Sequence, residues 1–214
     1  MGRGRVVTLT LVIETATAAC SVALIEGGRV VAAQHEVVGR GHAERLLPMI
    51  AELPGGGRAA HILVDVGPGS FTGIRVGIAA ARGLALGWNA SASGYSSLTL
   101  LAAAGFARHP NRESLAVVME GGHGEVFMQP FAAHPLAPIA GLVSCRPEVA
   151  LAGLAGRTAI GNGVRFLTAL EPDTAVNETL PRAVDALLLP AAFTALAPTP
   201  IYGRAPDAKP LAAA

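Results

Sequence analysis

The sequence predicts a mixed α/β protein of two lobes, and the order of its apolar patterns is the main evidence. Three short runs at residues 9–14, 20–26 and 29–38 read as strands, with links short enough for consecutive hairpins. Helical and strand-like segments then alternate as far as residue 106. From residue 114 a shorter series begins again with strand, turn and strand. Such alternation is typical of layered α/β lobes.

The composition limits the classes of function. A chain of 214 residues buries a sizeable core, as one large domain or two small lobes. Its formal net charge is +1 and Lys209 is its only lysine, so tight nucleic-acid binding by this chain alone is not expected. Charged residues make up 14%, against about 25% in typical domains. Either a partner covers part of the surface, or the composition is simply rich in alanine.

The N-terminal residues have the outline of a signal peptide, with arginines, an apolar run and small residues. The apolar run ends at Glu14 and a second strand-like run follows, which favours a first core strand over a signal. No apolar stretch is clean enough to span a membrane, and we expect a cytoplasmic protein with no membrane partner. Cys20 and Cys145 are too few for a disulfide framework, and neither they nor the histidines have metal-ligand spacing.

The apolar side chains of residues 42–53 recur at helical intervals, and this spacing predicts the first helix. Pro48 lies within this segment, where it removes one backbone donor and crowds the carbonyl of Glu44. Either the helix kinks at Pro48, or its regular part begins near that residue.

Six glycines between residues 64 and 87 follow a short apolar strand and run into a predicted helix at residues 72–86. Three explanations stay open: the loop holds a phosphate, forms a tight turn, or lets another helix come very close. The spacing is neither a Walker A motif nor the dinucleotide fingerprint. Free amides at a helix start nevertheless attract anions, and Ser70 or Thr72 can cap them.

Gly73 and Gly77 form a G-x-x-x-G step inside this helix, where each glycine costs up to about 1 kcal/mol relative to alanine. A stable helix keeps such glycines only where a close neighbour needs the room. The neighbour is either the chain's own sheet or a helix of another chain. Apolar residues on more than one side of the helix indicate burial on more than one side, which favours a partner.

Glu14 and Asp65 each end an apolar strand beside a glycine-rich or small-residue turn. Two carboxylates in such places could hold Mg²⁺ and a nucleotide, with Gly69 and Ser70 as neighbouring candidates. The alternative is that each carboxylate caps a turn or pairs with an arginine. Ser70 lacks the local motif of a nucleophile, and we predict no catalytic residue and no metal ligand.

The second half of the chain carries weaker signals. Residues 147–156 read as a helix and residues 158–164 as a strand followed by a turn. Residues 185–197 read as a helix that ends before Pro198. The proline-rich residues 200–214 are expected to be extended.

Several segments occur in an order and at distances that are familiar: "LVIETATAACSVAL", "GRGHAERLLPMI", "VGPGSFTGIRVGIAAARGLA" and "EGGHGEVF". They resemble the TsaB (YeaZ) family of tRNA threonylcarbamoyladenosine biosynthesis proteins, and "IYGRAPDAK" resembles the family's C-terminal motif. The resemblance covers nearly all of residues 1–130 and the C-terminal end. Residues 132–198 add little to it.

The resemblance implies an actin-like fold, of the sugar kinase, Hsp70 and actin class, with a short second lobe. The first lobe would comprise residues 1–106, and residues 107–214 would form the abbreviated second lobe and an extended tail. Members of the family are thought to be non-catalytic subunits that scaffold and activate a larger paralogue, TsaD. That paralogue places a threonylcarbamoyl group on the adenine next to the tRNA anticodon.

The resemblance also implies the cofactors and partners. An ATPase of TsaE type joins the pair, and ATP and a divalent metal are expected in the partner subunits, with no cofactor in this chain. We expect tRNA to be contacted only indirectly, and a homodimer is possible when the chain is alone. The family's pairing surface maps to the two helices at residues 42–53 and 72–86. The implied partner-binding residues are His42, Glu44, Leu46, Leu47, Ile50, Thr72, Gly73, Ile74, Arg75, Gly77, Ile78, Ala81 and Arg82.

The chain departs from the family's pattern at two motifs. Residues 14–16 read Glu-Thr-Ala where the family has Asp-Thr-Ser, and residues 120–123 read Glu-Gly-Gly-His where it has Asp-Ala-Arg. The longer acid and the lost hydroxyl would disturb a Mg²⁺–phosphate site, which disfavours nucleotide hydrolysis. Two further hypotheses stay open. One is a nucleotide-dependent kinase or metallopeptidase of the same fold, and the other is a self-associating module without a catalytic partner.

Overall fold

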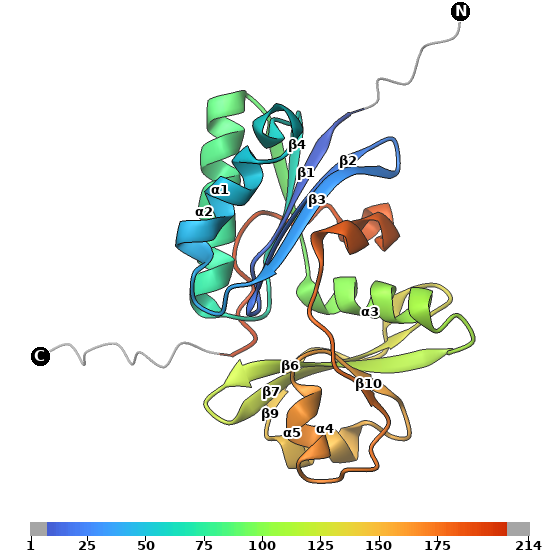
Figure 1. Cartoon of the computed structure of the whole chain (residues 1–214). Coiled ribbons are helices and arrows are strands. Elements are labelled where there is room, and N and C mark those ends of the chain that lie inside the picture. Colours follow the sequence, from blue (N-terminus) through green and yellow to red (C-terminus); the bar gives the residue numbers. More distant parts are fainter. Residues whose placement is uncertain (1–7, 205–214) are drawn as a thin grey trace, which may run out of the picture.

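The computed structural model describes residues 8–204, which form two β-sheets with helices around and between them (Figure 1). The strands of the first sheet are β1 (Thr10–Glu14), β2 (Ala19–Glu26), β3 (Arg29–Val37), β4 (His61–Asp65) and β5 (Ser91–Tyr95). Their order is β3-β2-β1-β4-β5. The pairs β1–β2 and β2–β3 are antiparallel, whereas β1–β4 and β4–β5 are parallel.

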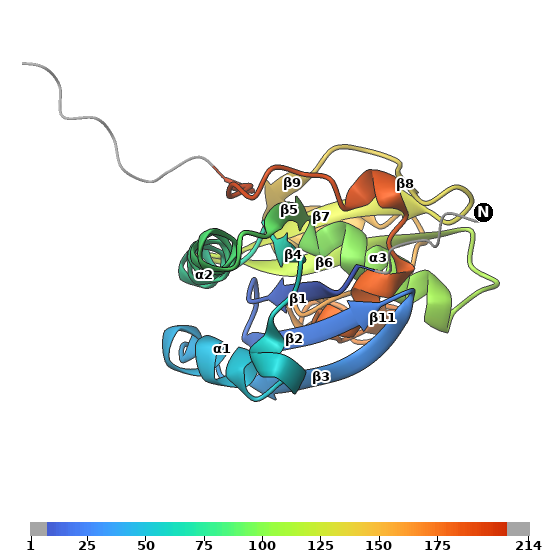
Figure 2. The ribbon, with the colours of Figure 1, turned by 90° about the horizontal axis from the view of Figure 1, so that it is seen from above.

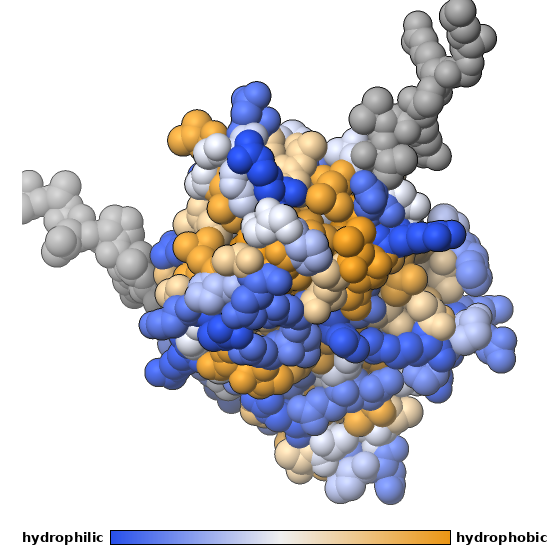
Figure 3. All heavy atoms as spheres, turned by 45° about the horizontal axis from the view of Figure 1, so that its top comes forward, coloured by the Kyte–Doolittle hydropathy of each residue, from blue (hydrophilic) through white to orange (hydrophobic). Residues whose placement is uncertain are grey.

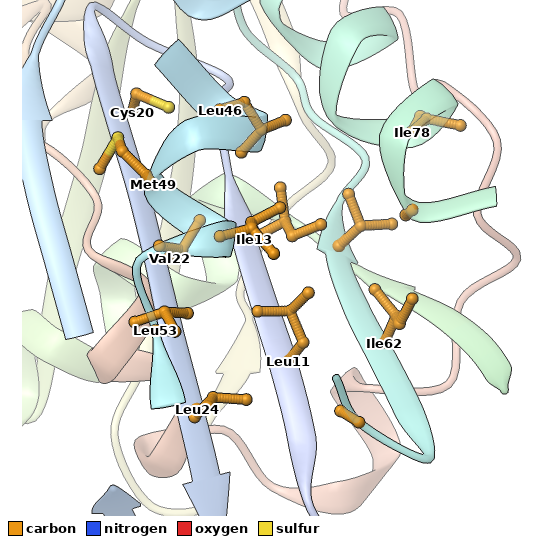
Figure 4. Close-up of a cluster of buried hydrophobic side chains, with 14 of the residues drawn as sticks. Leu11, Ile13, Cys20, Val22, Leu24, Leu46, Met49, Leu53, Ile62 and Ile78 are labelled. Carbon is orange, nitrogen blue, oxygen red and sulfur yellow. The ribbon is translucent and has the colours of Figure 1, made fainter. Parts of the chain in front are cut away.

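Strand β1 is buried on both faces, which confirms that it is a core strand. Successive side chains of a strand point to opposite faces. Leu11 and Ile13 face the helices α1 (His42–Ala51) and α2 (Phe71–Trp88), as Figure 4 shows for Leu11, Ile13 and their neighbours. Val12 joins a second cluster on the opposite face, with α3 (Ser97–Arg108). Burial on both faces accounts for the unbroken apolar run in the sequence.

Helix α1 begins at His42 and continues through Pro48 to Ala51. The alternative in which its regular part begins near Pro48 is therefore wrong. Pro48 lies on the exposed side of the helix, while Leu46 and Met49 are buried against the sheet. Their burial stabilises the helix despite the missing backbone donor.

The second sheet contains β6 (Ser114–Gly122), β7 (Glu125–Ala132), β8 (Ala137–Pro138), β9 (Val143–Cys145), β10 (Ala159–Ile160) and β11 (Val176–Asn177). Its order is β11-β10-β6-β7-β8, and β9 also pairs with β7. Helices α4 (Pro147–Gly153) and α5 (Val164–Thr168) cover the side of this sheet that points away from the first sheet. Helix α3 lies between the two sheets (Figure 1). Within residues 8–204, no helix has both the length and the apolar content that crossing a membrane requires.

The helix expected at residues 185–197 is wrong. Two short 3₁₀ helices stand there, η2 (Ala183–Leu188) and η3 (Ala191–Phe193). Pro190 separates them, because it has no backbone N–H to continue a helix. Ala183 and Ala186 pack against Val12 of the first sheet, so the chain returns to that sheet after completing the second.

Residues 196–204, here called the C-terminal strap, then run along the first lobe. Leu196 forms an antiparallel bridge with Gly94 of β5, and the amide of Ile201 donates to the carbonyl of Val66 at 2.7 Å. Residues 205–214, with the last part of the motif "IYGRAPDAK", lie outside the described residues. The strap thus brings the described end of the chain beside the start of α2.

Candidate partner-binding surface and buried carboxyl pair

The two glycines in the first half of α2 make room for the chain's own β1–β2 turn. A Cβ atom at Gly73 would overlap the carbonyl oxygen of Thr15, and one at Gly77 would overlap Oγ1 of Thr15. The Thr15 hydroxyl donates to the carbonyl of Gly73 at 2.8 Å, which holds the helix at this short distance. The expectation that Gly73 and Gly77 make room for a foreign helix is therefore wrong.

Gly69 and Ser70 complete this close approach at the helix start. A Cβ atom at Gly69 would overlap the carbonyl oxygen of Ala16, and the amide of Ser70 donates to the same oxygen at 2.7 Å. The Ser70 hydroxyl accepts from the amide of Gly73 at 3.2 Å, so Ser70 is the cap of the helix. Ser70, not Thr72, takes the capping role that the sequence left open between the two.

The second half of α2 presents an unfilled face. A Cβ atom at Gly83 or Gly87 would meet nothing within 4 Å, and both glycines are exposed. Leu86 beside them is 86% exposed, and Leu47 on α1 is 52% exposed. Helices α1 and α2 lie side by side at one side of the molecule (Figure 2). Figure 3 shows apolar side chains exposed among charged ones over the upper face of the molecule.

The structure divides the expected partner-binding residues into two groups. The buried group faces the chain's own sheet and consists of His42, Leu46, Ile50, Gly73, Ile74, Gly77, Ile78 and Ala81. The exposed group consists of Glu44, Leu47, Thr72, Arg75 and Arg82. Side chains of the first group cannot reach a partner in this conformation, so only the exposed group is accessible at the surface.

Sequence reasoning missed the exposed residues at the end of α2. The exposed positions of the helix recur at Thr72, Arg75, Ala79, Gly83 and Leu86, which is a helical period. The sequence could have indicated this stripe of exposed positions, because it lies on the side of the helix opposite the apolar positions. We call the exposed residues Glu44, Leu47, Thr72, Arg75, Ala79, Arg82, Gly83, Leu86 and Gly87 the outer face.

Glu14 and Asp65 lie together, fully buried, at the carboxyl ends of the neighbouring strands β1 and β4. The amide of Ala16 donates to Glu14 Oε1 at 2.9 Å, and the Tyr95 hydroxyl donates to Glu14 Oε2 at 3.0 Å. Asp65 Oδ1 accepts from the hydroxyl of Ser97 at 2.8 Å and from a backbone amide two residues on. The sequence did not single out Tyr95 or Ser97 as parts of this site.

The pKa values of both carboxyls are raised. Burial raises the pKa of Glu14 well above its ordinary value, and the neighbouring charge of Asp65 raises it further. Burial also raises the pKa of Asp65, although hydrogen bonds to its charged form oppose the increase. Asp65 Oδ2 has no fixed donor among the described residues. A proton on Glu14, which its raised pKa favours, would satisfy this oxygen.

The pair is a poor fit for a divalent metal. Three of its four oxygens already accept hydrogen bonds from the protein, and neither carboxyl lines the cleft between the lobes. Hard cations need several accessible oxygen ligands. Residues 8–204 contain no group of three acidic, histidine or cysteine side chains that could hold a metal ion.

The C-terminal strap binds two arginines of the outer face. The guanidinium of Arg75 stacks over the ring of Phe71 at 3.5 Å and donates to the hydroxyl of Tyr202 at 2.8 Å. Arg82 donates to the carbonyl of Pro198 at 3.1 Å. The rings of Phe71 and Tyr202 are about half exposed and lie 5.5 Å apart. The strap therefore fixes the direction of both arginines on the outer face.

A cleft of about 750 Å³ separates the two lobes. Its lining comes from the β1–β2 turn, the loop before α1, the start of α2, the β6–β7 turn, the segment after β10 and the strap. The polar lining residues are Thr17, Arg40, Ser70, Glu120, His123, Asn162, Tyr202 and Arg204. The candidates Gly69 and Ser70 line this cleft, whereas Glu14 and Asp65 lie beneath its floor.

A family model described as "TsaD: tRNA N6-adenosine threonylcarbamoyltransferase" matches residues 28–133. The TsaB proteins of Escherichia coli and Haemophilus influenzae are 39% and 38% identical over 124 and 122 residues, or 55% of this chain. The chain spans about half the length of these curated relatives, 52% and 51%.

Solved structures extend the likeness over most of the chain. YeaZ from Pseudomonas aeruginosa superposes with a TM-score of 0.76 and 28% identity, covering 91% of this chain and 99% of that one. A second structure from the same organism, described as similar to peptidase YeaZ, has a TM-score of 0.76 and 27% identity. It covers 92% of this chain and 100% of that one.

In each sheet, five strands follow one another in hydrogen-bonded order, and α3 lies between the sheets. This arrangement, together with the cleft, defines an actin-like fold of two lobes, as the resemblance implied. The matches to TsaB sequences and to YeaZ structures agree with this class. These comparisons support the TsaB (YeaZ) family, which the sequence resembles.

Proposed function

We propose that this chain is a non-catalytic subunit that scaffolds and activates a TsaD-type paralogue in tRNA threonylcarbamoyladenosine biosynthesis. Its curated relatives are named as proteins of that biosynthesis, and the matching family model is that of the transferase. The observation that carries the proposal is the outer face of α1 and α2. It is exposed, it is apolar in part, and it contains Gly83 and Gly87, beside which no described residue fills the space.

The outer face has the composition of a helix-docking surface. Gly83 and Ala79 present almost no side chain, and the distance between two packed helices depends on the side chains at their contact. Leu86 and Leu47 supply apolar area, and Arg75 forms part of a polar rim. A partner helix can thus approach the second half of α2 closely and bury Leu86.

The remaining parts of the proposal concern the complex. A TsaE-type ATPase joins the pair in the cytoplasm, and ATP and a divalent metal are held by the partner subunits. The tRNA is contacted through those subunits, in keeping with the net charge of +1. Without its partner, the outer face supports a homodimer, which light scattering with and without the paralogue would detect.

The test is the affinity for the purified TsaD-type paralogue, measured by calorimetry. Gly83→Leu adds a side chain to open helix surface, so the variant is expected to fold. It should bind the paralogue at least about tenfold more weakly, because the added side chain holds the partner helix away. Gly141→Leu is the matched control, since Gly141 also has nothing within 4 Å but lies in the second lobe. Equal affinity of Gly83→Leu and Gly141→Leu would refute the docking face.

Activation is tested separately, by threonylcarbamoylation of tRNA in a reconstituted system. The wild-type chain should raise the paralogue's rate, and Gly83→Leu should raise it less at limiting concentration. We do not propose a kinase or metallopeptidase, because Glu14 and Asp65 are buried beneath the cleft. ATP hydrolysis by the purified chain that Glu14→Gln abolishes would reinstate that alternative.

A further inference from the structure

We propose that Ser91 is an acyl-accepting site, whose hydroxyl is activated by His61 for attack on small activated esters. The proposed function gives this chain no reactive group, so the inference goes beyond it. His61 and Ser91 are the first residues of the parallel neighbours β4 and β5, and they stand directly opposite each other in the pairing of these strands.

The site lies on the other side of the first sheet from the outer face. Successive side chains of a strand point to opposite faces, so His61 shares its face with Leu63, and Ser91 shares its face with Tyr95. Leu63 and Tyr95 belong to the cluster that packs against α3 and η2, whereas α1 and α2 cover the opposite face. The hydroxyl of Ser91 is exposed there, so a small acyl donor can reach it.

Two serines hold the His61 ring between them. Nδ1 of the ring lies 2.8 Å from Oγ of Ser91, and Nε2 lies 3.0 Å from Oγ of Ser93. Ser93 donates its only hydroxyl proton to the carbonyl of Thr194 at 2.6 Å, so its oxygen accepts from the Nε2–H group of the ring. With that proton on Nε2, Nδ1 of the neutral ring is an acceptor.

The Ser91 hydroxyl therefore donates to Nδ1 of His61. The other acceptor near this hydroxyl, the carbonyl of Ala60, lies 3.4 Å away, which is longer than a usual O–H···O hydrogen bond. Burial lowers the pKa of His61 below its ordinary 6.5, so the neutral ring that can take up a proton predominates near pH 7. A hydroxyl bonded to a base that a third group orients is the arrangement that activates serine for acyl transfer.

The acylation step requires an activated ester as its only co-reactant. A lone pair of the Ser91 oxygen forms a bond to the carbonyl carbon of the ester, while the hydroxyl proton passes to Nδ1 of His61. The bond from that carbon to the leaving oxygen then breaks, and the leaving group departs with the electron pair and takes the proton from His61. The products are an ester of Ser91 and a free alcohol or phenol. Ser93 is a positioning residue, because it determines which ring nitrogen carries the proton.

The test is acetylation of the full chain by p-nitrophenyl acetate near neutral pH, quenched in acid and mapped by mass spectrometry. Ser91 should be acetylated at least about tenfold faster than Ser70, since a positioned base contributes about 10²–10⁴-fold. Ser70 is the matched control within the same chain. It is also exposed, and its hydroxyl is bonded to the amide of Gly73 and, within residues 8–204, to no histidine. His61→Gln removes the base and should slow acetylation of Ser91 at least about tenfold.

The role of Ser93 is tested by a pair of variants. Ser93→Ala leaves Nε2 of His61 without its acceptor, so acetylation of Ser91 should slow several-fold. Ser93→Thr keeps the hydroxyl and should restore the wild-type rate. A role of Ser93 in packing alone would not depend on the hydroxyl in this way.

Three results would overturn the inference. They are acetylation of Ser91 no faster than that of Ser70, a His61→Gln rate equal to that of the wild type, and an acetyl group that accumulates on His61 instead of Ser91. If circular dichroism shows that His61→Gln does not fold, the comparison of Ser91 with Ser70 in the wild-type chain still decides the matter. None of these measurements involves the TsaD-type paralogue, so this inference and the proposed function fail separately.

Discussion

Gly73 and Gly77, in the first half of α2, have the backbone or side chain of Thr15 against them, whereas Gly83 and Gly87, in the second half, face open space. The same residue type thus serves two purposes along one helix. In the first half, glycine lets α2 approach the β1–β2 turn of its own chain. In the second half, glycine costs helix stability and gains no contact with residues 8–204. The difference teaches that small residues predict a close neighbour without saying whose it is.

The first half is expected to be intolerant of any side chain, and Gly77→Leu gives the largest effect. The new side chain must displace Thr15 and Val64, which should lower the free energy of unfolding by about 3 kcal/mol. Urea denaturation followed by circular dichroism measures the loss. Gly83→Leu, the same change in the second half, should stay within about 0.5 kcal/mol of the wild type. Equal stability of the two variants would remove the distinction between the halves.

A second variant, Glu14→Gln, tests whether Glu14 is protonated in the folded chain. The folded state raises the pKa of Glu14 above its ordinary 4.5, so the native chain keeps a proton that the unfolded chain releases. Stability therefore falls as pH rises above about 4.5, by at most about 1.4 kcal/mol per pH unit for one proton. Glutamine has no proton to lose, and the Tyr95 hydroxyl can donate to the carbonyl of Ile13 instead.

The measurement is the free energy of unfolding between about pH 5 and about pH 8. The wild type should lose stability over this range, and Glu14→Gln should lose less, although Asp65 still contributes in the same direction. Glu44→Gln, an exposed change on α1, should keep the wild-type slope. A Glu14→Gln slope as steep as the wild type would show that Glu14 is not the protonated partner.

A smaller effect of opposite sign is expected in the second half of α2. Gly83→Ala should raise the free energy of unfolding by about 0.5–1 kcal/mol, because alanine favours the helix and meets no neighbour. Gly73→Ala, by contrast, should be destabilising, since its Cβ atom would overlap the Thr15 carbonyl. Thermal melts of the two alanine variants sharpen the comparison, and a loss of stability in Gly83→Ala would contradict it.

The smallest effect is expected at the strap. Tyr202→Phe keeps the ring beside Phe71 and removes the hydroxyl that accepts from Arg75. Because both side chains are exposed, stability should fall by no more than about 0.5 kcal/mol. Binding of the paralogue should weaken slightly, since Arg75 is then less restricted. A change in stability as large as that of Gly77→Leu would mean that the strap supports the first half of the helix.

Local patterns were enough to predict most of the first lobe. Apolar alternation located β1 and β4, and the helical period located α1 and α2 within a few residues of their ends. These elements are predictable because short-range spacing decides them. The helix expected at residues 185–197 failed because Pro190 interrupts it and because contacts with the first sheet hold η2 in place.

Long-range contacts explain what the sequence left hidden at the candidate site. Tyr95 lies 81 residues from Glu14, and Tyr202 lies 127 residues from Arg75. No spacing rule connects positions so far apart. The sequence could place Gly73 and Gly77 on one side of a helix, but it could not show that Thr15 fills that side. It therefore predicted a close approach correctly and assigned it to the wrong neighbour.

The bridge between Leu196 and Gly94 also decides how the first sheet ends. An uncovered edge strand offers unpaired amides and carbonyls to any other extended chain, which invites aggregation. Gly94 exchanges both of its hydrogen bonds with Leu196, at 2.7 Å and 3.1 Å, so the molecule's own backbone blocks β5 near its carboxyl end. A molecule that displaced the strap would expose this edge to other extended chains. The strap therefore prevents a sixth strand from adding to the first sheet at β5.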